Sequence, residues 1–327
     1  MSTLWDTTGS DVVKALTAER RAGGTTMSGL ALTLVIVVDE KQVAEAEEAA
    51  RVAASVHPCR LLMVIRRQVE APVPRLDAEV LIGGRLGPGE AVVMRMYGRL
   101  ALHAESVVLP LLAPDAPVVT WWHGPAPDVI AQDPLGVFAE RRITDSAWLA
   151  DPEEALRIRA EDYLPGDTDL AWTRVTGWRA ALAAAFDSLT GTPTGGCVAG
   201  NPALPSTMLL AGWLHARLGV EVECSASEGG DETDITAVRI ELDSGRVVQL
   251  CRVDGGTVSV SGAAGPDTVV QLPTRSLGEL LGEELRRLDA DQGYGDALAA
   301  ATGTAGLTER TGRRRHVWKD PAERASA

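Results

Sequence analysis

The chain has 327 residues, 45% of them hydrophobic and 23% charged, so it is long enough to form two globular cores. Its formal net charge of −14 repels phosphate backbones, which argues against nucleic acid as a partner. A membrane-spanning helix needs about twenty apolar residues, and the longest apolar run, 30–38, is too short for one.

The cysteines, Cys59, Cys197, Cys224 and Cys251, lie far apart and form no C-x-x-C pair, and the histidines lack metal-ligand spacing. The N-terminus carries no secretory signal pattern. We therefore expect a cytoplasmic protein with reduced thiols, no bound metal and no membrane association.

The N-terminal half predicts an α/β unit. An amphipathic helix is expected over 9–21, followed by a strand at 29–38 whose continuous apolar run is typical of a strand buried on both faces. A helix over 40–56, with small residues on one side, and a strand at 60–66 complete a parallel strand–helix–strand unit.

Strands at 76–83 and 90–97 are joined by GGRLGPGE, which predicts a hairpin turn. A helix at about 99–112 and a strand at 117–122 follow. The segment RRITDS, at 141–146, closes this first domain, which we place at 1–150.

The second domain, placed at 151–305, begins with a helix over 152–162. A longer helix is expected to start at about Asp169, with Thr168 or Asp169 as its N-cap. One side of this helix is apolar, and Arg179 falls within that stripe, which is unusual. The apolar stripe consists of Ala171, Trp172, Val175, Trp178, Leu182, Phe186 and Leu189.

A strand near 195–199 and a helix over 206–218, capped by Ser206 and closed by Gly219, come next. Short strands at 220–225, 235–242, 246–253, 257–261 and 267–272 precede helices at 276–289 and 292–302. The expected fold class is therefore α/β, with a mixed N-terminal sheet and a mostly antiparallel C-terminal sheet with helices. Residues 306–327, which include Arg310 and Arg313, are expected to form a disordered basic tail.

Signatures of catalysis and of nucleotide binding are missing from the sequence. The glycine-rich segments 83–90 and 195–201 do not fit a dinucleotide fingerprint, and no phosphate-binding loop of the Walker type or G-x-S-x-G elbow occurs. The second segment precedes a helix, so an anion site there remains an alternative to a plain loop. No cofactor is expected.

The segment HPCR places His57 and Arg60 between a helix end and a strand, where His57 can bond helix carbonyls and Arg60 can pair with an acid. Cys59, beside both, is either a structural residue or a thiol of lowered pKa. His103 and His123 are interpreted as surface or supporting residues.

Eight tryptophans stand against two phenylalanines and three tyrosines, and Trp and Arg are enriched at interface hot spots. Trp178 and Trp213 lie on apolar helical faces and are assigned to the core. Trp121 and Trp122 are neighbours on a strand, so one is expected in the core and the other exposed or at the domain junction. Trp172 and Arg179 are the stronger interface candidates.

Several segments together resemble the glucose-6-phosphate dehydrogenase assembly proteins of the OpcA family, in their actinobacterial branch. They are HPCR (57–60), LDAEVLIGG (76–84), DAPVVTWW (115–122), RRITDS (141–146), PGDTDLAWTRVTGWR (165–179) and SLGELLGEELRRLD (276–289). The chain departs from the pattern at Cys59, where Ser is common, and at Gly177, where Pro is common.

The resemblance implies a non-enzymatic protein that binds glucose-6-phosphate dehydrogenase in a hetero-oligomer, promotes the active oligomer or acts as its allosteric effector, and supports the oxidative pentose phosphate pathway. Two alternatives stay open: an enzyme of sugar-phosphate metabolism with an arginine-lined pocket, and a sugar-phosphate or nucleotide sensor. The residues expected to bind the partner or to support that surface are His57, Arg60, Trp121, Trp122, Arg141, Arg142, Asp145, Trp172, Arg174 and Arg179.

Overall fold

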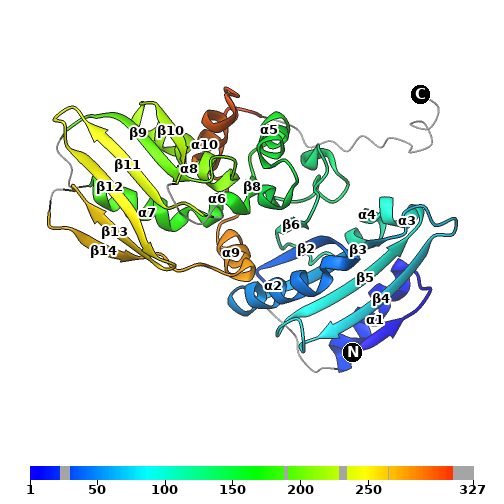
Figure 1. The fold of residues 1–327 in the computed structure, drawn as a ribbon. Helices are drawn as coiled ribbons and strands as arrows, with labels where there is room; N and C mark the ends of the chain where they lie inside the picture. The colour runs from blue at the N-terminus through cyan, green and yellow to red at the C-terminus, as the bar shows by residue number, and fades with distance from the viewer. Residues whose placement is uncertain (23–29, 188–190, 228–233, 264, 312–327) are drawn as a thin grey trace, which may run out of the picture. The chain divides into compact units, whose positions relative to one another are not determined.

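The computed structural model describes residues 1–22, 30–187, 191–227, 234–263 and 265–311 (Figure 1). The chain divides into two compact units, Met1–Ile143 and Thr144–Arg310, and each is described by itself. Each unit has its own sheet and its own apolar core, which confirms the predicted α/β class with a mixed sheet and a mostly antiparallel one.

In the first unit the strand order is β1-β4-β5-β3-β2-β6-β7. Strands β2, β3, β5, β6 and β7 are parallel neighbours, whereas β4 pairs antiparallel with β5 and β1. The strands are β1 (Ser2–Leu4), β2 (Leu32–Asp39), β3 (Cys59–Arg67), β4 (Arg75–Ile82), β5 (Glu90–Tyr97), β6 (Val118–His123) and β7 (Arg141–Thr144). The helices are α1 (Gly9–Ala22), α2 (Val43–Val56), α3 (Arg99–Leu102) and α4 (Glu105–Val108).

The strand–helix–strand unit β2-α2-β3 forms as its pattern predicts. Every residue of β2 from Leu32 to Val38 is buried, as expected of a strand covered on both faces. The buried side of α2 consists of alanines, among them Ala46, Ala50 and Ala54, whose small side chains allow a helix to lie close to a sheet.

The prediction of a single helix over 99–112 is wrong. The chain forms α3 and α4 and then a 3₁₀ turn over Leu109–Leu111, because His103 leaves helical geometry and Pro110 cannot continue an α-helix.

In the second unit a six-stranded sheet has the order β10-β9-β11-β12-β13-β14, with only the β9–β10 pair parallel. Its strands are β9 (Pro193–Gly200), β10 (Val222–Ala226), β11 (Ala237–Leu242), β12 (Val247–Asp254), β13 (Thr257–Ser261) and β14 (Thr268–Gln271). The remaining elements are α5 (Pro152–Asp162), β8 (Asp167–Asp169), α6 (Leu170–Arg174), α7 (Thr176–Phe186), α8 (Pro205–Leu218), α9 (Leu277–Glu284) and α10 (Gln292–Thr302).

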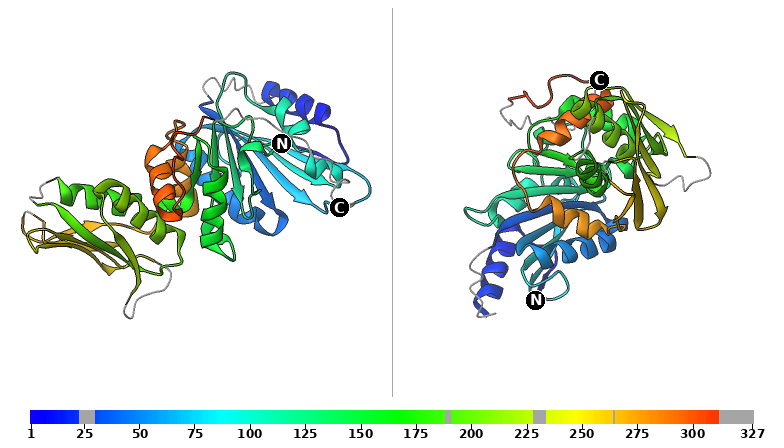
Figure 2. Two further views of the ribbon diagram at one scale, coloured as in Figure 1. Left: turned by 90° about the horizontal axis from the view of Figure 1, so that it is seen from above. Right: turned by 90° about the vertical axis from the view of Figure 1, so that its left-hand side faces the viewer.

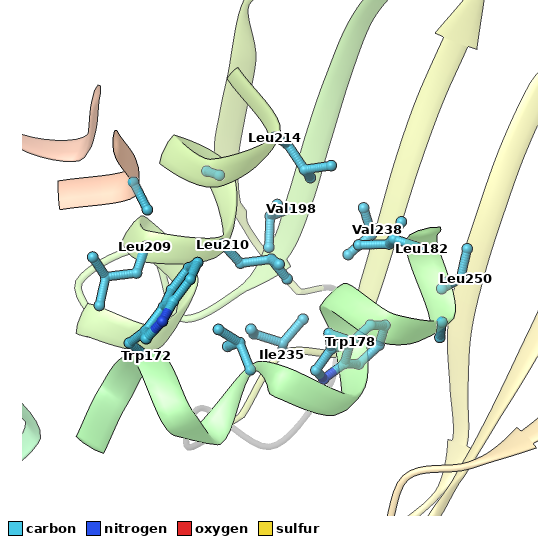
Figure 3. Packing of buried hydrophobic residues seen from close by; sticks show 14 of the residues in the cluster. Trp172, Trp178, Leu182, Val198, Leu209, Leu210, Leu214, Ile235, Val238 and Leu250 are labelled. Carbon is cyan, nitrogen blue, oxygen red and sulfur yellow. The ribbon is translucent and has the colours of Figure 1, made fainter. Parts of the chain in front are cut away.

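Helices α7 and α8 cover one face of this sheet (Figures 1 and 2). Trp178 and Leu182 of α7 and Leu210 of α8 pack with Val238 and Leu250 of the sheet, as Figure 3 shows. The helices therefore bury alternate side chains of each strand and leave the intervening ones on the other face.

The long helix predicted from Asp169 is interrupted. Asp169, one of the two predicted N-cap residues, caps it and accepts a hydrogen bond from the Ala171 amide, but α6 ends at Arg174. Val175 has φ −91° and ψ 7°, and α7 begins after it. Leu189 of the predicted stripe lies outside the described residues.

Three smaller expectations change. Leu204, not Ser206, occupies the N-cap position of α8, and the Ser206 hydroxyl donates instead to the Ala171 carbonyl. Helix α9 ends at Glu284, earlier than predicted. Of the tail predicted from 306, Leu307 is buried and Arg310 donates to the Ala160 carbonyl, so ordered chain continues to there. The rest of that tail, 312–327, lies outside the described residues.

Candidate partner-binding site and its supporting network

Two segments of the second unit, 144–146 and 169–171, meet around Asp169 at the start of α6. Its carboxylate accepts hydrogen bonds from the Thr144 hydroxyl at 2.7 Å, the Ser146 hydroxyl at 2.7 Å and the Ala171 amide at 2.9 Å. Complete burial raises the pKa of Asp169, as does the nearby charge of Asp145, and the hydrogen bonds only partly oppose this. Asp169 thereby fixes the entry of the chain into α6.

Asp145 and Arg174 form a bidentate ion pair next to this carboxylate. The two guanidinium nitrogens donate to the two carboxylate oxygens at 2.7 and 2.6 Å, and Asp145 is buried. Burial lowers the pKa of Arg174, but the hydrogen bond and charge of Asp145 outweigh this and leave it raised. Bidentate pairing fixes orientation as well as distance, so the pair ties the 144–146 segment to the end of α6.

The Arg179 guanidinium stacks on the Trp172 ring, 3.5 Å from its centroid. One of its nitrogens also donates to the Thr176 hydroxyl at 2.9 Å. On the other side, the Trp172 indole N–H donates to the Asp291 carboxylate at 2.8 Å. Burial lowers the pKa of Arg179 to about 10, against the opposing charges of Asp291, Glu283 and Glu284.

Helix α9 contributes the acids that face the α6–α7 junction. The Thr173 hydroxyl donates to buried Glu284 at 2.6 Å and the Thr176 hydroxyl to Glu283 at 2.8 Å. Arg275 donates to Glu283 and to the Thr173 carbonyl. Hydrogen bonds from Thr173 and Thr176 therefore fix the chain on both sides of the helix break at Val175.

A cavity of about 840 Å³ opens beside this network, between the first turn of α7 and the ends of β12 and β14. Arg174, Arg252 and Arg275 line it, but each guanidinium already faces an acid: Asp145, Asp234 at 2.8 Å and Glu283, respectively. A phosphate would have to displace one of these carboxylates, which makes the cavity a poor site for a sugar phosphate. Of the arginines singled out in the sequence, only Arg174 lines it.

In the first unit Arg60 is a buried structural residue. It donates to Glu90 at 2.8 Å and to the Leu111 carbonyl at 2.7 Å, and Arg20 also contacts Glu90, at 2.6 Å. Burial lowers the pKa of Arg60, and the Glu90 charge opposes that shift. The His57 amide donates to the Ala53 carbonyl, so His57 closes α2 through its backbone.

Both Trp121 and Trp122 are buried, so the alternative in which one of them is exposed is wrong. They do point to opposite faces of β6: Trp122 belongs to the apolar core, and Trp121 lies 4.9 Å, centroid to centroid, from the His123 ring. His123 itself is buried against Glu45, at 3.1 Å, so it is a supporting residue. Trp172, predicted as a surface residue, is buried as well, while Trp178 lies in the core as expected.

Arg141 and Arg142 are also buried, on β7. The Arg142 guanidinium donates to the Ala139 carbonyl at 3.0 Å. The structure thus brings Asp145, Trp172, Arg174 and Arg179 into one network of the second unit. The other predicted residues lie in the first unit. These first-unit residues are buried, or half-buried in the case of His57, so they do not form an exposed patch.

Sequence reasoning missed Asp291, Arg275, Glu283 and Glu284, which complete the network. A signal for α9 was present, because Ser276 and Glu279 form a capping box that marks a helix start. No local pattern indicates that the acids of this helix face Thr173 and Thr176, more than a hundred residues earlier in the chain.

The structure argues against two alternatives that the sequence left open, a thiol of lowered pKa at Cys59 and an anion site in the segment 195–201. Burial raises the pKa of Cys59 to about 12, so it is the opposite of an activated thiol. The glycines at 195–200 lie within β9, whose neighbours β10 and β11 pair with it on both sides. Its amides therefore serve the sheet and do not form an anion-binding loop.

Among the described residues there is no group of three or more His, Cys, Asp and Glu side chains that could hold a metal. None of the described helices is long and apolar enough to cross a membrane.

Several solved oxidoreductase structures are similar in fold at low identity. KijD10, a 3-ketoreductase from Actinomadura kijaniata, is 11% identical, with 83% of this chain and 95% of that chain covered and a TM-score of 0.43. UDP-N-acetylglucosamine 3-dehydrogenase GnnA from Acidithiobacillus ferrooxidans is 13% identical, with 85% and 97% covered and a TM-score of 0.33. The dehydrogenase MviM from Clostridium difficile is 7% identical, with 83% and 96% covered and a TM-score of 0.41. At these scores the likeness carries no functional argument.

No curated protein sequence matches the chain. Two family models do, in chain order. Residues 50–161 match the N-terminal domain of the glucose-6-phosphate dehydrogenase subunit, and residues 165–298 match its C-terminal domain. Both belong to OpcA, and together they include the Asp145–Arg174 pair and the Trp172–Arg179 stack. The chain is therefore a member of the OpcA family of glucose-6-phosphate dehydrogenase assembly proteins.

Proposed function

We propose that this chain is a non-enzymatic partner of glucose-6-phosphate dehydrogenase that binds it in the cytoplasm and favours its active oligomer. The observation that carries the proposal is the match of two consecutive family models, both named for a subunit of that dehydrogenase, over 50–161 and 165–298. Through its partner the chain would support the oxidative pentose phosphate pathway and NADPH supply.

The chemistry of the second unit supports binding over catalysis. Arg174 and Arg275, which line the cavity, are committed to internal carboxylates, and Arg179 is committed to a tryptophan ring. Such pairs make a surface rigid, and they leave few charged side chains available to act on a substrate. An effector shifts a partner's equilibrium only through contacts that differ between the partner's two states, and a rigid surface is suited to that task.

Mixing the purified chain with glucose-6-phosphate dehydrogenase from the same source tests the proposal. We expect co-elution on size exclusion, a larger dehydrogenase assembly, and faster NADPH formation that saturates as the chain is titrated. The chain alone, given glucose 6-phosphate and NADP⁺, should form no NADPH. An unchanged rate together with separate elution would contradict the proposal.

A sugar-phosphate sensor is the competing function, favoured by the size of the cavity beside α7. A ligand that binds the folded state raises the melting temperature by mass action. We expect no rise with glucose 6-phosphate, 6-phosphogluconate or NADP⁺. A saturating rise with one of them would replace the assembly proposal with the sensor.

A further inference from the structure

One face of the six-stranded sheet carries a row of uncharged side chains that crosses every strand. Helices α7 and α8 cover the opposite face, where Val198, Val238 and Leu250 are buried. The strand register aligns residues of the uncovered face in a row that crosses all six strands. That row consists of Ser225, Ala199, Ala237, Cys251, Ser259 and Val269.

These side chains are small and uncharged, and none of them is buried. The adjacent row contains Glu223 and Arg239, which have opposite charges, and Arg239 also pairs with Glu241 at 3.2 Å. Between these charged residues and the β14 edge the face presents Gln249, Cys251, Ser259 and Ser261, together with Val269. On a chain with a net charge of −14, this uncharged part of the face is where another protein meets the least repulsion.

The dimensions fit a protein–protein interface. With neighbouring strands about 4.8 Å apart and about 3.3 Å of rise per residue, six strands of about five residues cover roughly 500 Å² in plan. That is most of the ~800 Å² that one partner contributes to a standard interface. Small side chains let a second flat surface come close, as facing sheets do at about 10 Å.

We infer that this open sheet face, defined by the row from Ser225 to Val269, is the surface on which glucose-6-phosphate dehydrogenase docks. The inference rests on the proposed function. The occupant is a flat, weakly charged surface of the dehydrogenase. A second copy is disfavoured because the family description makes this chain a subunit of another enzyme.

The cysteines provide a direct readout. Cys197 and Cys251 lie on the open face, paired in register with Arg239 and Ala237 respectively. Cys224 lies on the helix-covered face, where its thiol approaches the Thr207 carbonyl of α8 at 3.9 Å. Cys59, in the first unit, is buried. Labelling by a maleimide probe therefore reports whether the open face is covered, and Cys224 and Cys59 serve as internal controls.

Mass spectrometry measures the rate at which maleimide labels each cysteine. We expect binding of the dehydrogenase to slow the labelling of Cys251 at least tenfold and to leave the labelling rate of Cys224 unchanged. Substitution Ala237→Arg should weaken binding at least tenfold, since it places a charge in the middle of the row. Ala216→Arg, the same change at an exposed position of α8, is the matched control and should bind like the unmodified chain.

Binding of the unmodified chain without protection of Cys251, and with Ala237→Arg binding normally, overturns the inference and leaves the proposed function standing. Absence of binding by the unmodified chain overturns both. If Cys251 is protected from maleimide in the chain alone, and dilution removes that protection, the face binds a second copy of the chain. That outcome also overturns the inference. The labelling measurement needs no variant, so a folding defect in Ala237→Arg does not block the test.

Discussion

The guanidinium of Arg179 lies 3.5 Å from the centroid of the Trp172 ring, across the interruption between α6 and α7. Arg179 is the fourth residue of α7 and Trp172 belongs to α6, and Val175 between them departs from helical geometry. The stack joins the two helices at the point where their backbone hydrogen bonding is interrupted. An arginine within an apolar stripe is thereby explained by the ring that it covers.

Replacing Arg179 should therefore destabilise the second unit. A desolvated cation–π contact is worth about 2 kcal/mol, so Arg179→Ala should lower the unfolding free energy by about 1–3 kcal/mol in urea denaturation. Arg179→Lys should recover only a minor part, because a lysine ammonium lacks the planar group that stacks. Equal stability of Arg179→Lys and the unmodified chain would show that charge alone, and not stacking, matters here.

The Asp145–Arg174 pair should show strong coupling. Arg174→Met leaves the buried Asp145 carboxylate without its cation, and breaking buried pairs costs about 3–5 kcal/mol; the partial exposure of Arg174 places our expectation near 2–4 kcal/mol. In a double-mutant cycle, Asp145→Ala combined with Arg174→Met should cost less than the sum of the single changes. Additive costs would mean that the two side chains act independently.

A substitution of Arg60 distinguishes a residue that stabilises the fold from one that contacts the dehydrogenase. Arg60→Met removes the bonds to Glu90 and to the Leu111 carbonyl, so the melting temperature should fall, with a cost of about 2–4 kcal/mol. Because Arg60 is buried, the folded variant should bind the dehydrogenase with unchanged affinity, measured well below its melting temperature. A weaker affinity with intact stability would make Arg60 a contact residue.

Cys59 predicts a loss of stability at alkaline pH. Its thiol has an ordinary pKa of 9.0, which burial raises to about 12 in the folded chain. Between these values the unfolded state loses its proton and the folded state does not, so stability falls as pH rises above 9. At pH of about 10 the loss from this residue is roughly 1.4 kcal/mol.

Denaturation of the unmodified chain and of Cys59→Ala at several pH values measures this contribution. The variant is expected to be less stable near neutral pH, because it leaves a small cavity, but its stability should decline less steeply above pH 9. Parallel declines for the two chains would mean that Cys59 does not titrate on unfolding.

The local patterns of the sequence determined most of the elements and the fold class. The apolar run of β2, the alanine face of α2, the capping role of Asp169 and the alternation of the C-terminal strands are encoded within a few residues of each other. The interactions that form these elements act between residues close together in the chain, so the sequence alone was enough to predict them. The family resemblance also rested on local segments, and matching family models confirm it.

Only the tertiary structure decided that Trp121, Trp172 and Arg142 are buried. The pairing of Trp172 with Asp291 and that of Thr173 with Glu284 join residues more than a hundred positions apart, and no periodicity encodes them. Burial of Trp121, Trp172 and Arg142 follows from packing around them, since hydrophobic or charged character alone does not fix exposure. The charge-free row on the open sheet likewise appears only after strand register aligns six separate segments, because register and not sequence distance sets cross-strand neighbours.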